Sequence, residues 1–207
     1  LQGDSNRYFF KALLAAGLSA QPLLSLNVAE PELQTRDGAL LTAHYASASY
    51  FQRLPGEANR QFVEAYQGRF GSDRVSSGPI EATYVAVQLW AQAVRNEQSA
   101  ALDRVQPALL RLALKAPSGL VAVDRRSRHL WRYFRVGKAR ADGQFDQVYA
   151  SAQALRPQPY PLAHTRREWD QLSAALNAEW LSKAPVPGPA LSPDGAKTPP
   201  PADGDRP

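Results

Sequence analysis

The sequence of 207 residues predicts an α/β fold. Two observations support this class. In the first half, segments with apolar residues at helical spacing alternate with short apolar runs, and from Leu120 onward the apolar period changes to two. The resulting order is helix, strand, helix and strand, then further helices, then a hairpin, which is typical of α/β proteins. An apolar content of 44% is enough to bury a core.

The first part of the chain is predicted to hold two helices and two strands. Residues 6–16 place aromatic and aliphatic side chains at helical spacing, and Gly17 is a natural helix end. Residues 18–26 are predicted to form a short buried strand. A turn opening a short helix is expected over residues 27–33. Residues 40–50 alternate small, aromatic and polar side chains and predict a strand that runs into a loop.

Three helices are predicted in the middle of the chain. The helix over residues 59–70 is amphipathic, with one aromatic and aliphatic stripe. The helix over residues 82–95 is apolar on most faces, so we expect it to be buried. The third spans residues 103–114, with Asp103 as its cap and Pro107 in its first turn.

A hairpin follows these helices. Residues 116–119 predict a turn and residues 120–123 a strand. Residues 129–139 are expected to form a longer strand. The Ala-Asp-Gly sequence at 141–143 is a hairpin turn signal, and residues 144–149 form the return strand.

The last part of the chain differs in composition. A proline-rich extended connection over residues 157–161 leads to a predicted helix over residues 167–180. Residues 184–207 contain eight of the 17 prolines and no aromatic residue. Such a segment lacks the apolar surface needed for folding, so we expect a disordered tail. The sequence has no Met, so we expect that residue 1 is not a natural start.

The positive charge is concentrated in one segment. The net charge is +5, and residues 125–140 hold seven cations and no acid. Aromatic residues lie among these cations, a pattern that fits nucleic-acid binding by phosphate contact and stacking. The alternation in residues 131–136 fits a half-buried strand better, with charged side chains outside and aromatic ones inside. We therefore expect no nucleic-acid partner.

The residues do not support an enzyme. There is no Cys, and the three His (His44, His129 and His164) lie on three different predicted elements. No nucleophile, zinc or phosphate-binding motif is present. Two pairs of carboxylates, Glu30 with Glu32 and Asp142 with Asp146, are interpreted as caps and turns. We predict no catalytic residue, no metal site, no cofactor and no segment inserted in a membrane.

Small polar side chains follow the predicted strands, where α/β sheets bind ligands. They lie in residues 3–6, in residues 25–30 and at the end of the strand over residues 40–50. One interpretation is a site for a small polar solute. The other is ordinary helix caps and turns, and the residues alone leave both open.

Many short segments, in order from residue 3 to about 180, resemble the second half of one family. They include Gly3-Asp4-Ser5-Asn6, Ser25-Leu26-Asn27-Val28-Ala29-Glu30, Tyr50-Phe51, Asn59-Arg60-Gln61-Phe62, Arg69-Phe70-Gly71, Glu81-Ala82-Thr83-Tyr84, Ala116-Pro117-Ser118-Gly119, His129-Leu130-Trp131 and Ala141-Asp142-Gly143. The family is that of type I periplasmic solute-binding proteins. Within it, the sequence looks like the urea and short-chain amide branch of ABC importers, which is similar to the cytoplasmic amide sensor that regulates amidase expression.

The resemblance implies a two-lobed, venus-flytrap fold that is incomplete here, with the hairpin near the hinge. It implies that residues 1–48 end lobe two and that residues 49–130 return to lobe one. Residues 131–183 would then hold the hairpin and the last helix near the hinge or lobe two, followed by the tail.

The resemblance also implies the function and the site. The lobes would close on urea, a short-chain amide or a related small polar solute, and the partners would be the membrane subunits of an ABC importer. Position alone places five candidate ligand-binding residues at the cleft: Asp4, Ser5, Ser25, Asn27 and Tyr50. The expected location is periplasmic, and the alternative is a cytoplasmic amide-sensing regulator.

Overall fold

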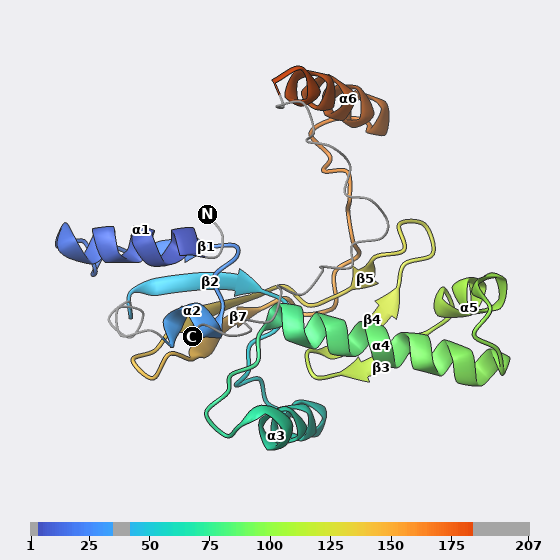
Figure 1. Ribbon diagram of the computed structural model, residues 1–207, viewed down its shortest axis with the longest axis horizontal. Coiled ribbons are helices and arrows are strands. Elements are labelled where there is room, and N and C mark those ends of the chain that lie inside the picture. The colour runs from blue at the N-terminus through green and yellow to red at the C-terminus, as the bar shows by residue number, and fades with distance from the viewer. Residues whose placement is uncertain (1–3, 35–41, 184–207) are drawn as a thin grey trace, which may run out of the picture. The chain divides into compact units, whose positions relative to one another are not determined.

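The computed structural model describes residues 4–34 and 42–183, which fall into two compact units that divide after Pro159. The first unit contains all seven strands of the described residues and five of their helices (Figure 1). Its elements are α1 (Asp4–Ala15), β1 (Leu23–Ser25), α2 (Glu30–Leu33), β2 (His44–Ala48), α3 (Glu57–Phe70), α4 (Gly78–Glu97), α5 (Leu102–Leu109), β3 (Ala113–Ala116), β4 (Gly119–Val123), β5 (Leu130–Trp131), β6 (Arg135–Ala139) and β7 (Phe145–Ala150). The predicted α/β class is confirmed. The predicted tail lies outside the described residues.

The first unit holds two sheets. The larger, which we call sheet A, has the order β1-β2-β6-β7, with β1 parallel to β2 and the other pairs antiparallel. The smaller, sheet B, is the antiparallel set β3-β4-β5. Figure 1 shows β2 with α1 and α2 on either side of it, while α4 lies beside sheet B with α5 at its far end. The chain therefore leaves sheet A after β2, forms sheet B with β3, β4 and β5, and returns to sheet A with β6 and β7.

The chain passes between the two parts of this unit twice. Residues 49–56, the first crossing, leave β2 for α3 and α4. Residues 132–134, the second crossing, lead from β5 of sheet B back to β6 of sheet A. This second passage corrects the expectation of one continuous strand over residues 129–139. Its two ends pair with different sheets, so the strand is interrupted at Arg132, which forms an isolated bridge with Leu155.

The burial of this segment differs from the prediction at two neighbouring residues, Phe134 and Arg135, while residues 131–133 are all half-buried. Charged side chains were expected outside and aromatic ones inside, but Arg135 is 8% exposed while Phe134 is 42% exposed. The buried guanidinium of Arg135 donates to the carbonyl oxygens of Ser49 and Ser118, at 2.6 and 2.7 Å. Backbone acceptors therefore stabilise an arginine on the inner face.

Two predicted elements are shorter than expected. The strand over residues 18–26 is confined to Leu23–Ser25, because residues 18–21 form a turn and Pro22 has no N–H to donate. The helix over residues 103–114 ends at Leu109, and residues 113–116 form β3 instead. Ala101, rather than Asp103, is its N-cap, and Pro107 lies inside the helix, where it removes a backbone hydrogen bond.

The helix α4 is confirmed in position, but the expectation that it is buried on most faces is wrong. Val85, Leu89 and Ala93 are buried, the first two in one cluster with Ala116 and Val121 of sheet B. The outer face exposes Tyr84, Val87 and Trp90, with Val87 56% exposed. The apolar residues of α4 therefore include one packed face and an outer face on which Tyr84 contacts Phe62 of α3 while Val87 and Trp90 remain exposed.

The main core lies between sheet A, its helices and the first crossing. It contains Phe10 of α1, Leu33 of α2, Phe51 of the first crossing and Phe145 of β7, with six further buried residues. Gly137 of β6 allows this packing, since a Cβ there would lie 2.7 Å from Cζ of Phe51. The hairpin of β6 and β7 turns at Gly143, whose φ of 72° suits glycine, and this confirms the predicted turn.

The second unit contains one described helix, α6 (Arg166–Lys183), which confirms the helix predicted over residues 167–180. Thr165 and Glu168 form reciprocal hydrogen bonds at its start. Its stripe of apolar residues is largely exposed, including Leu172, Leu176 and Trp180. In the part of the chain that the structure describes, no helix is long and apolar enough to cross a membrane.

Candidate functional site

A pocket of about 380 Å³ opens at the carboxyl ends of β1 and β2. These strands are parallel, so the segments that follow them meet at the same sheet edge. The loop after β1 and the helix α2 form one wall, the first crossing forms another, and Ser77, Gly78 and Pro79 at the start of α4 form the third. The pocket therefore lies between sheet A and the helix that packs on sheet B.

The structure brings two of the five candidate residues together at this pocket. Asn27 and Tyr50 both line it. Ser25 is the last residue of β1 and is half-buried outside the lining, and Ser5 is exposed on α1. Asp4 is the first residue of α1.

Tyr50 is buried, and its hydroxyl group is engaged within the protein. The hydroxyl lies 2.9 Å from Oδ1 of Asn59 and 2.9 Å from Oγ of Ser76. Burial raises the pKa of Tyr50 above its usual value, while the hydrogen bond with Ser76 lowers it. The ring of Tyr50 therefore shapes the pocket wall, and its hydroxyl group joins the first crossing to α3 and to the segment before α4.

Glu30 lies in the polar segment 25–30 that follows β1, but it was interpreted as a helix cap and was not among the five candidate residues. It lines the pocket at the start of α2, and it is 1% exposed. Its Oε1 accepts a hydrogen bond of 2.7 Å from the backbone N–H of Gln52, and its Oε2 has no hydrogen-bond partner among the described residues. Burial raises the pKa of Glu30 to about 7, although the hydrogen bond from Gln52 lowers it. The only signal in the sequence is an acid that directly follows the apolar residues Val28 and Ala29.

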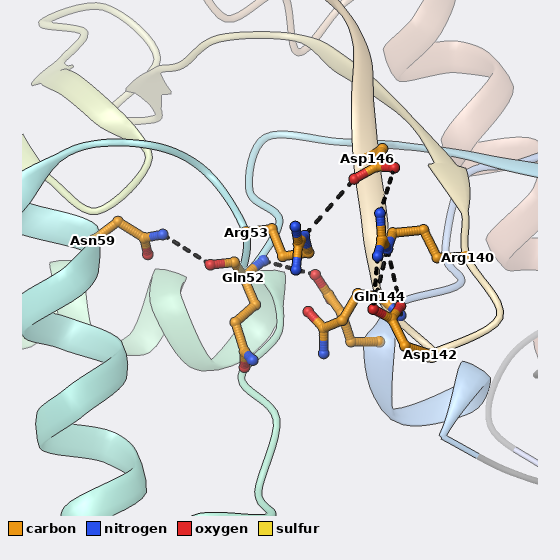
Figure 2. A network of polar contacts seen from close by, with 8 residues as sticks. Gln52, Arg53, Asn59, Arg140, Asp142, Gln144 and Asp146 are labelled. Atoms are coloured by element: carbon orange, nitrogen blue, oxygen red, sulfur yellow. Dashed lines mark hydrogen bonds and ion pairs between the residues drawn. The ribbon is translucent and has the colours of Figure 1, made fainter.

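Gln52 connects Glu30 to the rest of the first crossing. Its backbone carbonyl accepts from Nδ2 of Asn59 at 2.8 Å, as Figure 2 shows. Its side-chain Oε1 accepts from the backbone N–H of Ser76 at 2.5 Å. Beside this group, Arg140 holds Asp142 and Asp146, and Arg53 lies 3.7 Å from Asp146 (Figure 2). Arg53 and Arg140 therefore form their ion pairs with Asp142 and Asp146 rather than with Glu30.

The walls of the pocket differ in electrical character. Glu30 and Glu32 are acids, and none of the residues that line the pocket is a cation. The third wall is the start of the 20-residue helix α4, where Ser77 makes no side-chain cap. The first N–H groups of a helix lack partners within it and lie at its positive end. Pro79 has no N–H, so the backbone donors that this wall can offer are the N–H groups of Ser77 and Gly78, opposite the acids of the first wall.

A second polar cluster lies at the other crossing. The carboxylate of Glu81, in the first turn of α4, accepts from Nη2 of Arg132 and, at 2.7 Å, from Oγ of Ser118. Arg135 donates to the carbonyl of Ser118 and to Oε1 of Gln147. With Arg140, and with Arg125, whose Nε donates to the carbonyl of Leu110 at 3.4 Å, at least four of the seven cations in the basic segment are used in internal contacts.

The described residues hold no group of three or more His, Asp or Glu that could bind a metal ion. His44 is buried on β2 against Phe10, with its ring edge-on at 5.1 Å, and burial lowers its pKa. His129 precedes β5, and His164 lies in the second unit. The three histidines are therefore on separate segments, as the sequence predicts.

Residues 1–166 match the family described as periplasmic binding protein domain. The chain belongs to this family. The fold and the pocket fit this class, an α/β domain with a pocket at the carboxyl ends of parallel strands.

Individual relatives agree on the fold. An amino acid ABC transporter substrate-binding protein from Pseudomonas fluorescens Pf-5 matches with a TM-score of 0.66 and 15% identity, over 76% of this chain and 44% of that one. A solute-binding protein of an ABC transporter from Rhodopseudomonas palustris BisB5, in complex with 3,4-dihydroxybenzoic acid, gives 0.65 and 17%, over 75% and 44%. The chain thus spans less than half the length of these structures.

One curated relative is closer in sequence. A protein named limonene hydroxylase, from Geobacillus stearothermophilus, is 35% identical over 116 residues, which are 56% of this chain and 21% of that protein. The chain therefore corresponds to about a fifth of that relative.

Proposed function

We propose that this chain forms part of the solute-binding component of an ABC importer and acts in the periplasm. The observation that carries the proposal is the pocket at the carboxyl ends of β1 and β2, in a chain of the periplasmic binding protein domain family. Importer membrane subunits would be the protein partners of the complete binding protein.

The two crossings support a lobed arrangement. In this proposal residues 1–48 end lobe two, residues 49–130 belong to lobe one, and residues 131–183 return toward the hinge and lobe two. Sheet A and sheet B then lie on different lobes, and the pocket lies between them. Closure of the lobes on the solute would be a shift of population toward the closed state, driven by contacts made only there.

The proposed solute is urea, a short-chain amide or a related small polar molecule. Such a solute carries both N–H donors and a carbonyl acceptor. The acids Glu30 and Glu32 favour N–H groups, and the start of α4 favours a carbonyl oxygen. A carboxylate would meet like charge from one wall, so we expect benzoates to bind less well here.

Nuclear magnetic resonance of this chain tests the proposal without requiring tight binding. We expect urea or acetamide to shift the backbone amide signals of Asn27, Ser47 and Gly78, which line the pocket. Leucine and 3,4-dihydroxybenzoate are compared in the same way. The variant Asn27→Ala should weaken the response, whereas the control Ser5→Ala, on the exposed face of α1, should not.

Two results would contradict the proposal. Shifts confined to residues outside the pocket would overturn the site. A response to 3,4-dihydroxybenzoate but not to urea or acetamide would overturn the assigned solute class.

A further inference from the structure

Two walls of the pocket, the first crossing and the start of α4, are joined through one ring of hydrogen bonds that also includes Asn59 of α3. Gln52 binds the N–H of Ser76 through its side chain and Nδ2 of Asn59 through its carbonyl. Asn59 in turn binds the hydroxyl of Tyr50, and that hydroxyl contacts Oγ of Ser76, which closes the ring. Ser76 directly precedes Ser77 and Gly78, which line the pocket. A shift of Gln52 is therefore transmitted to the wall formed by α4.

Glu30 contacts this ring at one point, the backbone N–H of Gln52. It is the α2 residue through which the wall of sheet A is tied to the first crossing. We propose that Glu30 is a positioning residue that makes the shape of the solute pocket depend on proton uptake, by strengthening or weakening its hold on Gln52. This inference rests on the proposed function, because it concerns the regulation of the same pocket.

The geometry explains why a proton would matter there. A carboxylate is a charge-assisted acceptor and binds an N–H more strongly than a neutral carboxyl group does. The same carboxylate is costly when buried, and one oxygen of Glu30 has no partner among the described residues to offset that cost. Its pKa, raised to about 7 by burial, places the proton change near neutral pH.

The charged groups on the surrounding elements leave the pKa of Glu30 raised. Glu32, on the same helix, is a like charge and raises the pKa of Glu30 further. Arg53 of the first crossing lies beside Asp146 of β7, and Arg140 of the hairpin is held by Asp142 and Asp146. Tyr50, whose own pKa is raised, stays neutral in this range. No cation among the described residues forms an ion pair with Glu30.

A pH titration followed by nuclear magnetic resonance, without solute, tests the coupling. Between about pH 5.5 and about pH 8.5, we expect the Gln52 amide signal to shift with a midpoint near 7. The signals of Ser76 and Ser77 should follow with the same midpoint. The variant Glu30→Gln should lose this step at all three residues. The control Glu32→Gln, on the same helix, should keep it at a lower midpoint.

The side-chain carboxyl signal of Glu30 in the unaltered protein gives a second measurement that needs no variant. A midpoint of Glu30 that differs from those of Ser76 and Ser77, or a step that persists in Glu30→Gln, would overturn the proposal.

Solute titrations at about pH 6 and about pH 8 then distinguish pH control of the pocket from the proposed solute-binding function. A several-fold change in acetamide affinity that disappears in Glu30→Gln supports pH control of the pocket, and equal affinities overturn it. If acetamide, urea and leucine all fail to bind while the amide step is present, the proposed solute-binding function fails and the coupling does not.

Discussion

Replacement of Arg132 by Met should destabilise the protein strongly. The side chain of Glu81 is 0% exposed and that of Arg132 is 18% exposed, so the pair is largely removed from water. Methionine keeps much of the apolar stem but cannot donate to the carboxylate. Glu81 would then retain only the hydroxyl and, at 3.4 Å, the N–H of Ser118 as partners.

The expected loss follows from the cost of leaving a buried charge without its partner. Breaking one side of a buried ion pair costs about 3–5 kcal/mol. For a chain of this length each 1 kcal/mol lowers Tm by roughly 2–4 °C, so we expect a decrease of about 6–20 °C. The double variant Glu81→Leu with Arg132→Met should recover most of the loss, because no charge then remains buried.

Urea unfolding and thermal melting, both followed by circular dichroism, measure these values. The matched control is Arg60→Met on α3, where the arginine is paired with Glu57 and Glu64 but is 58% exposed. An exposed pair of this kind contributes about 1 kcal/mol or less. The Arg132–Glu81 pair is not a stabilising buried ion pair if Arg132→Met loses no more unfolding free energy than Arg60→Met, or if the double variant is less stable than Arg132→Met.

Three further variants test the packing and charge around the pocket. Because the pKa of Glu30 is raised, the stability that Glu30 contributes is complete below the unfolded pKa of about 4.5 and is lost as pH rises through 7. Between about pH 4 and pH 8, the free energy of unfolding of Glu30→Gln should therefore rise by about 3 kcal/mol relative to that of the wild type. Free energies from urea unfolding that change with pH in parallel for the two proteins would contradict this. Gly137→Ala should cost about 1–3 kcal/mol by thermal melting, because its Cβ meets Phe51, whereas Gly68→Ala in the open helix position should stabilise by about 0.5–1 kcal/mol. Tyr50→Phe should cost about 1–3 kcal/mol by leaving two buried groups without their partner, and a neutral effect on urea unfolding would show that the hydroxyl is not needed.

Local patterns were sufficient for the α/β class and for most helices, because helical spacing and glycine stops are properties of neighbouring residues. They were not sufficient for the segment around Arg135. Alternation in residues 131–136 states which side chains share a face, but it does not state which face is buried. That choice depends on Ser49 and Ser118, which are distant in the sequence and supply the acceptors for Arg135.

The element boundaries failed for a similar reason. Ala113 and Leu114 were expected to end the helix of α5, but they pair with Ala122 and Val121 of β4, and the pairing outweighs the local preference. Leu130 pairs in sheet B and Val136 in sheet A, so the long predicted strand is divided by a change of partner. Neither partner is visible from local periodicity.

Local sequence patterns identified some residues of the candidate site and missed others. The rule for strand ends led to residues 25–30 and to the end of the strand over residues 40–50, because that rule depends only on sheet topology. The resemblance singled out Asn27 and Tyr50 within these segments, and both line the pocket. Glu30 was interpreted as a cap, since an acid near a helix start usually is one. Its importance arises from burial and from Gln52, which lies 22 residues further along the chain.

The two crossings are held by different polar clusters, and this makes the predictions separable. The first is held through Glu30 and Gln52, and the second through Glu81 and Arg132. Arg135 is the side chain that contacts both regions, since it donates to Ser49 at the start of the first crossing and to Ser118 beside Glu81. Changes at Glu30 and at Arg132 share no hydrogen-bond partner in the described part of the chain, so their effects on stability should add. A measured coupling between them would require a route through Arg135 or through Ser77, whose carbonyl accepts from the backbone N–H of Glu81 at 2.9 Å. Such a coupling would mean that the two crossings move as one hinge.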